Sequence, residues 1–425
     1  MKMLAASIIT VAVLSASACS SDETGSESTP SPASTEQPQP EYVADVESTV
    51  DQLMQDNAIP GAVVQISSPD RGDWTGTFGT GTIDADDPLS ATDHFRIGSN
   101  TKTMTVTVIL QLVQEGQLSL DDPISNYVEG VPNGETITIS ELAEMRSGLY
   151  NYSADPEFNA TLDREPEKAW TPEELLQIAF SHPVEFAPGE QFEYSNTNTV
   201  LLGLVIEELT EMPVAEAFEE RIFAPLGLAN TSFPAIEDAS IPDPHPQGYM
   251  FGTNVSTIDT FALPEDEQPA AVAGTVKPND VTDDNPSWTW TAGAAISTVG
   301  DMTTYVKALV GGGLLDEQMQ QTRLDSIRSV GAATAGYGLG MARFGPLLGH
   351  DGQLPGFMTF MGHDPETDLT LVVATNLSTV PSGEGSALTL VKGILPIFYG
   401  SEYQEPDDPA RAPGSETTAT PTPGG

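Results

Sequence analysis

The stretch Phe95–Gly116, FRIGSNTKTMTVTVILQLVQEG, limits the folds open to this chain more than any other part of it. Its segment Thr103–Leu112 is rich in β-branched residues, which are common in strands. The length of the apolar run and the Gly116 that closes it nevertheless favour a buried helix. Residues three apart share a helix face, so the Ser99 hydroxyl and the Lys102 ammonium are expected to point the same way.

The Ser99–Lys102 pair could act as a nucleophile and its base. A serine hydroxyl becomes a useful nucleophile when a base removes its proton. A lysine can be that base only where desolvation or a neighbouring cation lowers its pKa, and Lys102 over a buried helix can meet that condition. The helix N-terminus would also favour a developing oxyanion. The alternative is an N-cap Ser99 beside a solvated Lys102, because the Ser-x-x-Lys spacing is common.

The net charge of the chain limits the kinds of partner that it can bind. The chain has 425 residues, enough for one large domain or two ordinary ones, and its 39% hydrophobic content can fill a sizeable core. It carries 15 Lys and Arg against 62 Asp and Glu, a formal net charge of −47. This balance argues against a nucleic-acid partner and against simple docking on anionic lipid. It fits a surface exposed to salty or extracellular surroundings.

Residues 1–18 are predicted to be a secretory signal, because the apolar segment Leu4–Leu14 is too short to span a bilayer and small residues follow it. Cys19 comes next and is the only cysteine, so no intrachain disulfide can form. Its position resembles a bacterial lipobox, although Ala16 stands where leucine is usual. We expect lipidation of Cys19 and attachment to the outer side of the cell membrane. Ordinary signal-peptidase cleavage after Ala18 is the alternative.

Two polar segments flank the predicted folded body at 42–400. Residues 19–41 contain Ser, Thr, Pro, Glu and Gln but no Lys or Arg, and 401–425 end in Thr-Pro-Thr-Pro-Gly-Gly. Such segments bury too little apolar surface to fold, so we predict a disordered tether and a disordered tail.

Strand patterns stand at both ends of the body and helical patterns in its middle. Predicted strands lie at Ala62–Ser67, Trp74–Ile83 and within Gly336–Thr379, including Leu369–Ala374. Predicted helices are Val43–Gln55, one capped by Ser140, Thr171–Phe180, Thr197–Thr210, Asp301–Val310 and Ala387–Phe398. The expected fold class is α+β: an antiparallel sheet built from both ends and flanked by helices, with an inserted, mostly helical subdomain.

Tyr194-Ser195-Asn196 directly precedes one of the predicted helices. A tyrosine hydroxyl near an ammonium has a lowered pKa and can relay a proton. The Asn196 amide can donate to a substrate carbonyl and hold a lysine with its oxygen. A core tyrosine and a helix-capping asparagine are the alternative interpretation.

His350-Asp351-Gly352-Gln353 falls on a predicted edge strand. A His-x-Gly sequence there can place a polar side chain in a cleft, and the glycine lets a substrate lie close to the strand. The N–H groups of Gln353 and Ser99 could then form a two-donor oxyanion hole. Taken alone, His350 could equally be a structural or surface histidine.

Together the three motifs resemble those of the serine β-lactamase and penicillin-binding DD-peptidase superfamily, in the branch of class C β-lactamases, D-alanyl-D-alanine carboxypeptidases and esterases. The likeness covers about Tyr42 to Gly400. Five further stretches support it: Arg146–Leu149, Pro225–Leu228, Ala292–Thr298, Tyr337–Gly340 and Gly349–Phe357. The resemblance implies the β-lactamase/transpeptidase-like fold.

The resemblance also implies roles for the first two motifs. Ser99 would be the acylated nucleophile. Lys102 and Tyr194 would share the general-base and proton-relay work. Asn196 would orient the substrate amide and Lys102.

For the third motif, His350 would stand where class C β-lactamases carry lysine and some DD-peptidases carry histidine. Gly352 and Gln353 would shape the substrate-binding strand. Asp351 departs from the family, which usually has a hydroxyl residue there to help bind the substrate carboxylate. An aspartate would repel a carboxylate unless it points away, and Arg343 is a candidate for the missing positive charge.

Trp288 and Trp290 are candidates for the cleft wall, although a pair of core tryptophans is the alternative. Other hydrolase motifs are absent: Ile97 breaks the G-x-S-x-G pattern around Ser99, and no H-E-x-x-H or phosphate-binding loop occurs. The remaining histidines show no metal-ligand spacing. We therefore expect no metal and no cofactor.

The resulting prediction is a monomeric, lipid-anchored serine hydrolase that acts on D-alanyl peptides as a D-alanyl-D-alanine carboxypeptidase does. Its substrate would be a small molecule or a peptidoglycan peptide. An esterase or a β-lactamase on the same site is one alternative, since the rate of deacylation separates these activities. A non-catalytic surface protein that binds the cell wall is the other.

Overall fold

The computed structural model describes residues 39–256, 258–331, 334–400 and 403. The predicted signal sequence, Cys19, and nearly all of the predicted tether and tail lie outside the described residues. Within those residues, no helix combines the length and apolar character needed to cross a membrane.

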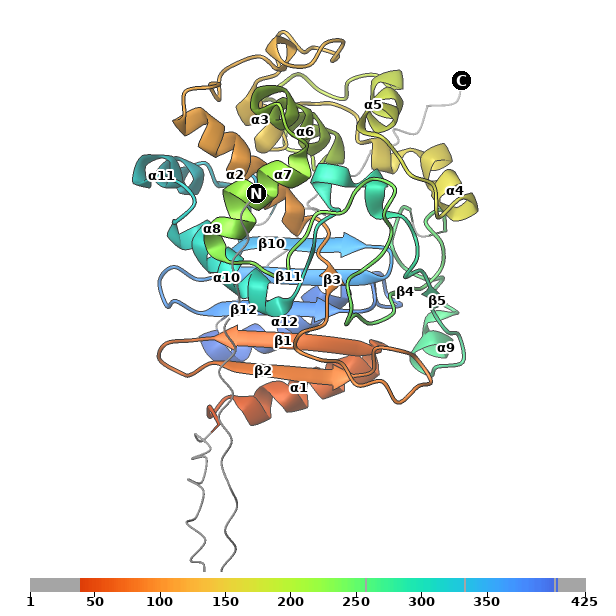
Figure 1. Cartoon of the computed structure of the whole chain (residues 1–425). Helices are drawn as coiled ribbons and strands as arrows, with labels where there is room; N and C mark the ends of the chain where they lie inside the picture. The colour runs from red at the N-terminus through yellow and green to blue at the C-terminus, as the bar shows by residue number, and fades with distance from the viewer. Residues whose placement is uncertain (1–38, 257, 332–333, 401–402, 404–425) are drawn as a thin grey trace, which may run out of the picture. The chain divides into compact units, whose positions relative to one another are not determined.

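The centre of the fold is an antiparallel eight-stranded sheet in the order β2-β1-β12-β11-β10-β9-β8-β7 (Figure 1). Its strands are β1 (Gly61–Ser67), β2 (Trp74–Gly79), β7 (Arg328–Ser329), β8 (Ala335–Tyr337), β9 (Ala342–Phe344), β10 (Leu347–Leu354), β11 (Phe357–His363) and β12 (Thr370–Thr375). Two small sheets pair β3 (Phe95–Arg96) with β6 (Ile296–Ser297), and β4 (Tyr249–Met250) with β5 (Asn279–Asp280). Because β1 pairs with β12, the prediction that both ends of the body build one sheet is confirmed.

Helices connect and cover these strands, and most of them come from the middle of the chain. They are α1 (Val43–Asp56), α2 (Asn100–Gln114), α3 (Ile139–Ala143), α4 (Pro156–Arg164), α5 (Pro172–Ser181), α6 (Asn196–Thr210), α7 (Val214–Phe218), α8 (Ala224–Leu226), α9 (Gln268–Val272), α10 (Val299–Gly311), α11 (Glu317–Asp325) and α12 (Ser386–Tyr399). Figure 1 shows α3, α5 and α6 beyond β10, in the place of the predicted helical insertion.

The alternating side chains of the sheet serve two cores. In β1, Ala62, Val64 and Ile66 join the core that α1 and α12 cover, whereas Val63 joins the core built with α2, α6 and α10. This division follows from the two-residue repeat of a strand. Burial on both faces explains why β1 and β12 are rich in apolar residues.

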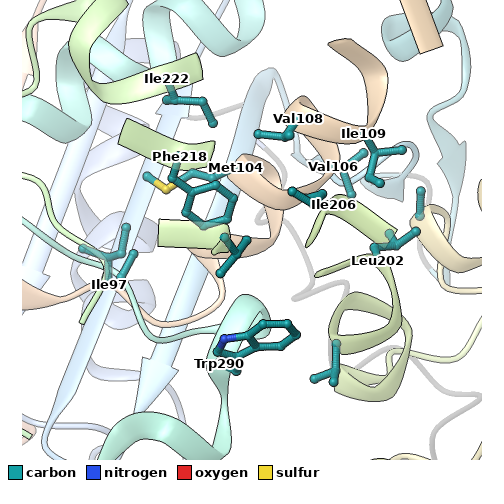
Figure 2. Packing of buried hydrophobic residues seen from close by; sticks show 14 of the residues in the cluster. Ile97, Met104, Val106, Val108, Ile109, Leu202, Ile206, Phe218, Ile222 and Trp290 are labelled. Carbon is teal, nitrogen blue, oxygen red and sulfur yellow. The ribbon is translucent and has the colours of Figure 1, made fainter. Parts of the chain in front are cut away.

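The β-branched segment predicted to form a helix does so as α2. Its buried threonines bond back to carbonyl oxygens three or four residues earlier, as Thr103 does to Asn100 and Thr107 does to Thr103. Those bonds satisfy the hydroxyls, so nearly all of α2 can be buried. Figure 2 shows its apolar side chains packed among residues of α6 and α7, including Leu202, Ile206 and Phe218.

The prediction that His350–Gln353 lies on an edge strand is wrong in one respect. β10 lies inside the sheet, between β11 and β9, but β9 reaches only as far as Gly349. Among the residues that the structure describes, β10 pairs only with β11 from His350 to Leu354. The motif therefore occupies a stretch whose second edge is not bound to another strand of the sheet.

The predicted cap of α3 is also wrong. Thr138, not Ser140, is the N-cap: its Oγ1 accepts the Glu141 N–H at 3.2 Å, and the Glu141 carboxylate accepts the Thr138 N–H at 2.9 Å. This reciprocal pair is a capping box, and the sequence carries its Thr-x-x-Glu signature.

Thr138→Ala should therefore lower the free energy of unfolding by about 1 kcal/mol, because it leaves the Glu141 N–H without its acceptor. Ser140→Ala is the matched control and should change the free energy of unfolding by less than about 0.5 kcal/mol. Urea denaturation of both variants measures the difference, and equal losses would contradict the assignment of the cap.

Candidate active site

The turn before α2 lies against the unpaired half of β10, and two glycines make this possible. A Cβ on Gly352 would stand 1.9 Å from the Ile97 carbonyl oxygen and 2.8 Å from the Ser99 nitrogen. A Cβ on Gly98, whose φ is +53°, would stand 2.7 Å from the Gln353 nitrogen. These two close contacts bring the backbone nitrogen of Ser99 near the backbone nitrogen of Gln353.

The first turn of α2 keeps its own donors occupied. The N–H groups of residues 100, 101 and 102 donate to the carbonyl oxygens three residues earlier, at 3.3, 3.0 and 3.0 Å. The N–H groups of residues 100, 101 and 102 are therefore not free to bind an oxyanion, although the start of a helix would suggest that they are. The oxyanion hole from the N–H groups of Ser99 and Gln353 remains a prediction, and their juxtaposition favours it.

Lys102 is fully buried, with 0% of its surface exposed. Its Nζ lies 2.9 Å from Ser99 Oγ and 2.8 Å from the carbonyl oxygen of Ala292. Burial lowers the pKa of Lys102 to about 7, and the Asp351 carboxylate opposes part of that shift. The amine is therefore poised to exchange a proton with Ser99 near neutral pH.

Tyr194 covers this lysine. The Lys102 Nζ lies 4.8 Å from the centre of the Tyr194 ring, within the range of a cation–π contact. The ring also packs edge-on against Tyr337, with centroids 6.0 Å apart, and at 6.1 Å from the His350 ring. The structure thus brings together Ser99, Lys102 and Tyr194, which the sequence predicts to be catalytic.

His350 is buried, with 1% of its surface exposed, and it is neutral. Burial, then the Lys102 charge, lowers its pKa to about 3. Its Nδ1 lies 2.6 Å from the Asp351 carbonyl oxygen, and its Nε2 lies 3.2 Å from the Tyr337 hydroxyl. Burial raises the pKa of Tyr337, so that hydroxyl donates to Nε2 while Nδ1–H donates to the carbonyl. This histidine therefore brings no positive charge to the site.

The hydrogen bonds of Asn196 go to residues other than the predicted Lys102. Its Nδ2 donates to Ser153 Oγ at 3.0 Å, and its backbone N–H donates to Asn151 Oδ1 at 3.1 Å. The acceptors of Lys102 are Ser99 Oγ and the Ala292 carbonyl oxygen instead. The role of Asn196 toward substrate remains a prediction.

The other candidates lie further out. Arg343 donates to Ser329 Oγ and to the Ala335 carbonyl oxygen, which places its guanidinium over β7 and β8. Trp290 is buried in the core beside α2 (Figure 2). Trp288 packs its ring against Phe158, with centroids 5.9 Å apart. In the part of the chain that the structure describes, no group of His, Cys, Asp or Glu side chains is arranged to hold a metal ion.

Two residues of the site have no role in the sequence prediction: Ala292, which accepts from Lys102, and Tyr337, which donates to His350. Both begin stretches that carry the family resemblance, so a signal was present. The sequence could not assign their functions. For Ala292 the reason is that any residue type can supply a backbone carbonyl acceptor.

Comparison with known proteins finds a matching family and several relatives. The Beta-lactamase family model matches residues 46–393. Protein flp of Staphylococcus aureus (strain COL) is 31% identical over 193 residues, which are 44% of this chain and only 38% of that protein. Penicillin-binding protein 4* of Bacillus subtilis (strain 168) is 24% identical over 343 residues, or 79% of this chain and 71% of that protein.

Among solved structures, a D-stereospecific amidohydrolase from Streptomyces sp. superposes with a TM-score of 0.69 and 29% sequence identity. The match covers 83% of this chain and 99% of the amidohydrolase. The fold is thus shared over nearly the whole described body.

Gly352→Ala should lower kcat/KM by about 100-fold, because its Cβ would push β10 away from Ser99 and misplace the reacting groups. Gly300→Ala is the control, since a Cβ there would meet nothing closer than 3.8 Å. Steady-state kinetics on one ester substrate compare the two variants. Full activity of Gly352→Ala would contradict the close approach of β10 to Ser99.

Proposed function

This chain belongs to the Beta-lactamase family of serine hydrolases, and from that premise we propose that it cleaves amide and ester bonds of D-aminoacyl compounds through an acyl-enzyme on Ser99. One observation carries the proposal. A fully buried lysine, with its pKa lowered to about 7, lies 2.9 Å from the hydroxyl it would deprotonate. A structural lysine gains nothing from such a position, whereas a general base requires it.

In the proposed reaction the neutral Lys102 amine takes the proton of Ser99 Oγ as that oxygen bonds to the substrate carbonyl carbon. The N–H groups of Ser99 and Gln353 stabilise the negative charge on the carbonyl oxygen. The bond to the leaving nitrogen or oxygen then breaks, and the leaving atom receives the proton from Lys102 through the Tyr194 hydroxyl. Water next attacks the serine ester and gives up its proton by the reverse route. The products are the free acid and the original Ser99.

The substrate class is supported by the relatives. The Streptomyces protein is described as a D-stereospecific amidohydrolase and shares 29% identity over 83% of this chain. D-alanyl-D-alanine carboxypeptidase activity is a second candidate, favoured by the match to penicillin-binding protein 4* over 79% of the chain.

The direct test is intact-protein mass spectrometry of the chain after brief incubation with a D-aminoacyl ester. An adduct of the acyl mass is expected on the wild type and not on Ser99→Ala. The same substitution should reduce turnover by about 10⁴-fold or more, because the nucleophile is removed. A β-lactam incubated in parallel reports penicillin binding if the adduct persists and β-lactamase activity if it decays.

Absence of both adduct and turnover with the ester, the amide and the β-lactam would contradict an acyl-enzyme. It would favour the alternative of a non-catalytic protein that binds the cell wall.

The pH dependence should reveal the base. With the pKa of Lys102 at about 7, kcat/KM should fall about tenfold per pH unit below 7 and level off above it, because only the neutral amine accepts the serine proton. Lys307→Met is the control, since Lys307 binds Ser67 Oγ far from Ser99 in sequence and should leave the profile unchanged. A profile that is flat between pH 5 and pH 9 would exclude Lys102 as the base.

A further inference from the structure

The carboxylate of Asp351 lies beside the reacting groups, between His350 and Gly352 on β10. Its side chain is 9% exposed, and its Oδ1 is 3.5 Å from His350 Nδ1. The next residue, Gly352, touches the backbone at Ser99. Asp351 therefore stands one residue from the contact between β10 and the nucleophile.

Three titratable side chains from three elements interact electrostatically with this carboxylate. They are Lys102 of α2, His350 of β10 and Tyr337 of β8. All three are held toward their neutral forms. Burial lowers the pKa of Lys102 to about 7 and that of His350 to about 3, and it raises the pKa of Tyr337. Above neutral pH the site thus contains a carboxylate and no fixed cation from these side chains.

Two arginines, Arg343 and Arg323, make their hydrogen bonds to other parts of the fold. Arg343 donates to Ser329 and Ala335 over β7 and β8. Arg323 is fully buried and donates to Thr107 Oγ1 and to the Leu339 carbonyl oxygen. Through these contacts the Arg343 guanidinium is held at β7 and β8, and the Arg323 guanidinium is held at α2 and Leu339.

The leaving group must come close to Asp351. In the proposed reaction its departing atom takes a proton from Lys102 and Tyr194, so it lies beside them. Asp351 acts electrostatically on Lys102, and the neighbouring His350 ring lies 6.1 Å from the Tyr194 ring. A carboxylate on the leaving group would enter a poorly hydrated space that already holds one negative charge.

We infer that Asp351 is a specificity-determining residue that makes the site reject leaving groups bearing a carboxylate. The preferred substrates are then D-aminoacyl amides and esters whose leaving group is uncharged or carries an amine, rather than peptides that end in a free D-alanine. This inference rests on the proposed function. Two unit charges about 6 Å apart at an effective dielectric constant of about 20 repel enough to change kcat/KM on the order of 100-fold.

The test uses the full chain and two substrates that differ in one group: an N-acyl-D-alanyl-D-alanine and its C-terminal amide. The wild type should prefer the amide by about 100-fold in kcat/KM. Asp351→Asn, which keeps the side-chain shape, should bring the ratio within about threefold of unity by raising kcat/KM for the carboxylate substrate. Asp351→Thr is the second variant and should shift the ratio in the same direction.

Asp364→Asn is the matched control, because Asp364 is also a buried aspartate (2% exposed, against 6% for Asp351) and accepts hydrogen bonds from Thr367 and Tyr399. Its ratio should equal that of the wild type. A merely structural role for Asp351 would lower both rates together and leave the ratio unchanged.

Equal cleavage of the two substrates by the wild type, or a ratio that neither Asp351 variant changes, overturns the inference and leaves the proposed function intact. No cleavage of either substrate and no adduct on Ser99 contradicts the proposed function itself, and the inference falls with it.

Discussion

Burial of the Lys102 amine is the condition on which the rest of the site depends. A lysine with its ordinary pKa of 10.5 would be neutral in only about one molecule in three thousand at pH 7. At a pKa of about 7, half of the molecules carry the neutral amine. Desolvation, rather than a neighbouring cation, supplies this shift. The spacing of Ser99 and Lys102 along α2 then converts a buried base into an activated nucleophile.

The fold supplies this burial through parts that are distant in sequence. α2 packs against the sheet and against α6 and α7, and the Lys102 side chain is fully buried there. The carbonyl oxygen of Ala292 and the ring of Tyr194 complete its surroundings. Asp351 opposes part of the shift in the Lys102 pKa. One carboxylate thereby adjusts the base and sets the charge that a substrate meets.

Local patterns predicted much of this arrangement, and distant contacts explain what they missed. The helix at Ser99 and the strands at both ends follow from periodicity and residue type, which act over short distances, whereas the grouping of the three motifs into one site came from the family resemblance. The neutrality of His350 follows from neither, because it depends on burial and on Tyr337 in another strand. The same holds for Asn196, which binds Ser153 in place of Lys102. The cap of α3 was predicted at Ser140, and the pairing with Glu141 in the structure shows that it is Thr138.

The ionisation of Lys102 tests the central claim most directly. The chain has six lysines, so ¹³C labelling of the lysine ε-carbons gives a spectrum simple enough to assign by substitution. One resonance should titrate with a midpoint of about 7 and should be missing in Lys102→Met. If every lysine titrates above pH 10, Lys102 is charged at neutral pH and cannot be the base that activates Ser99.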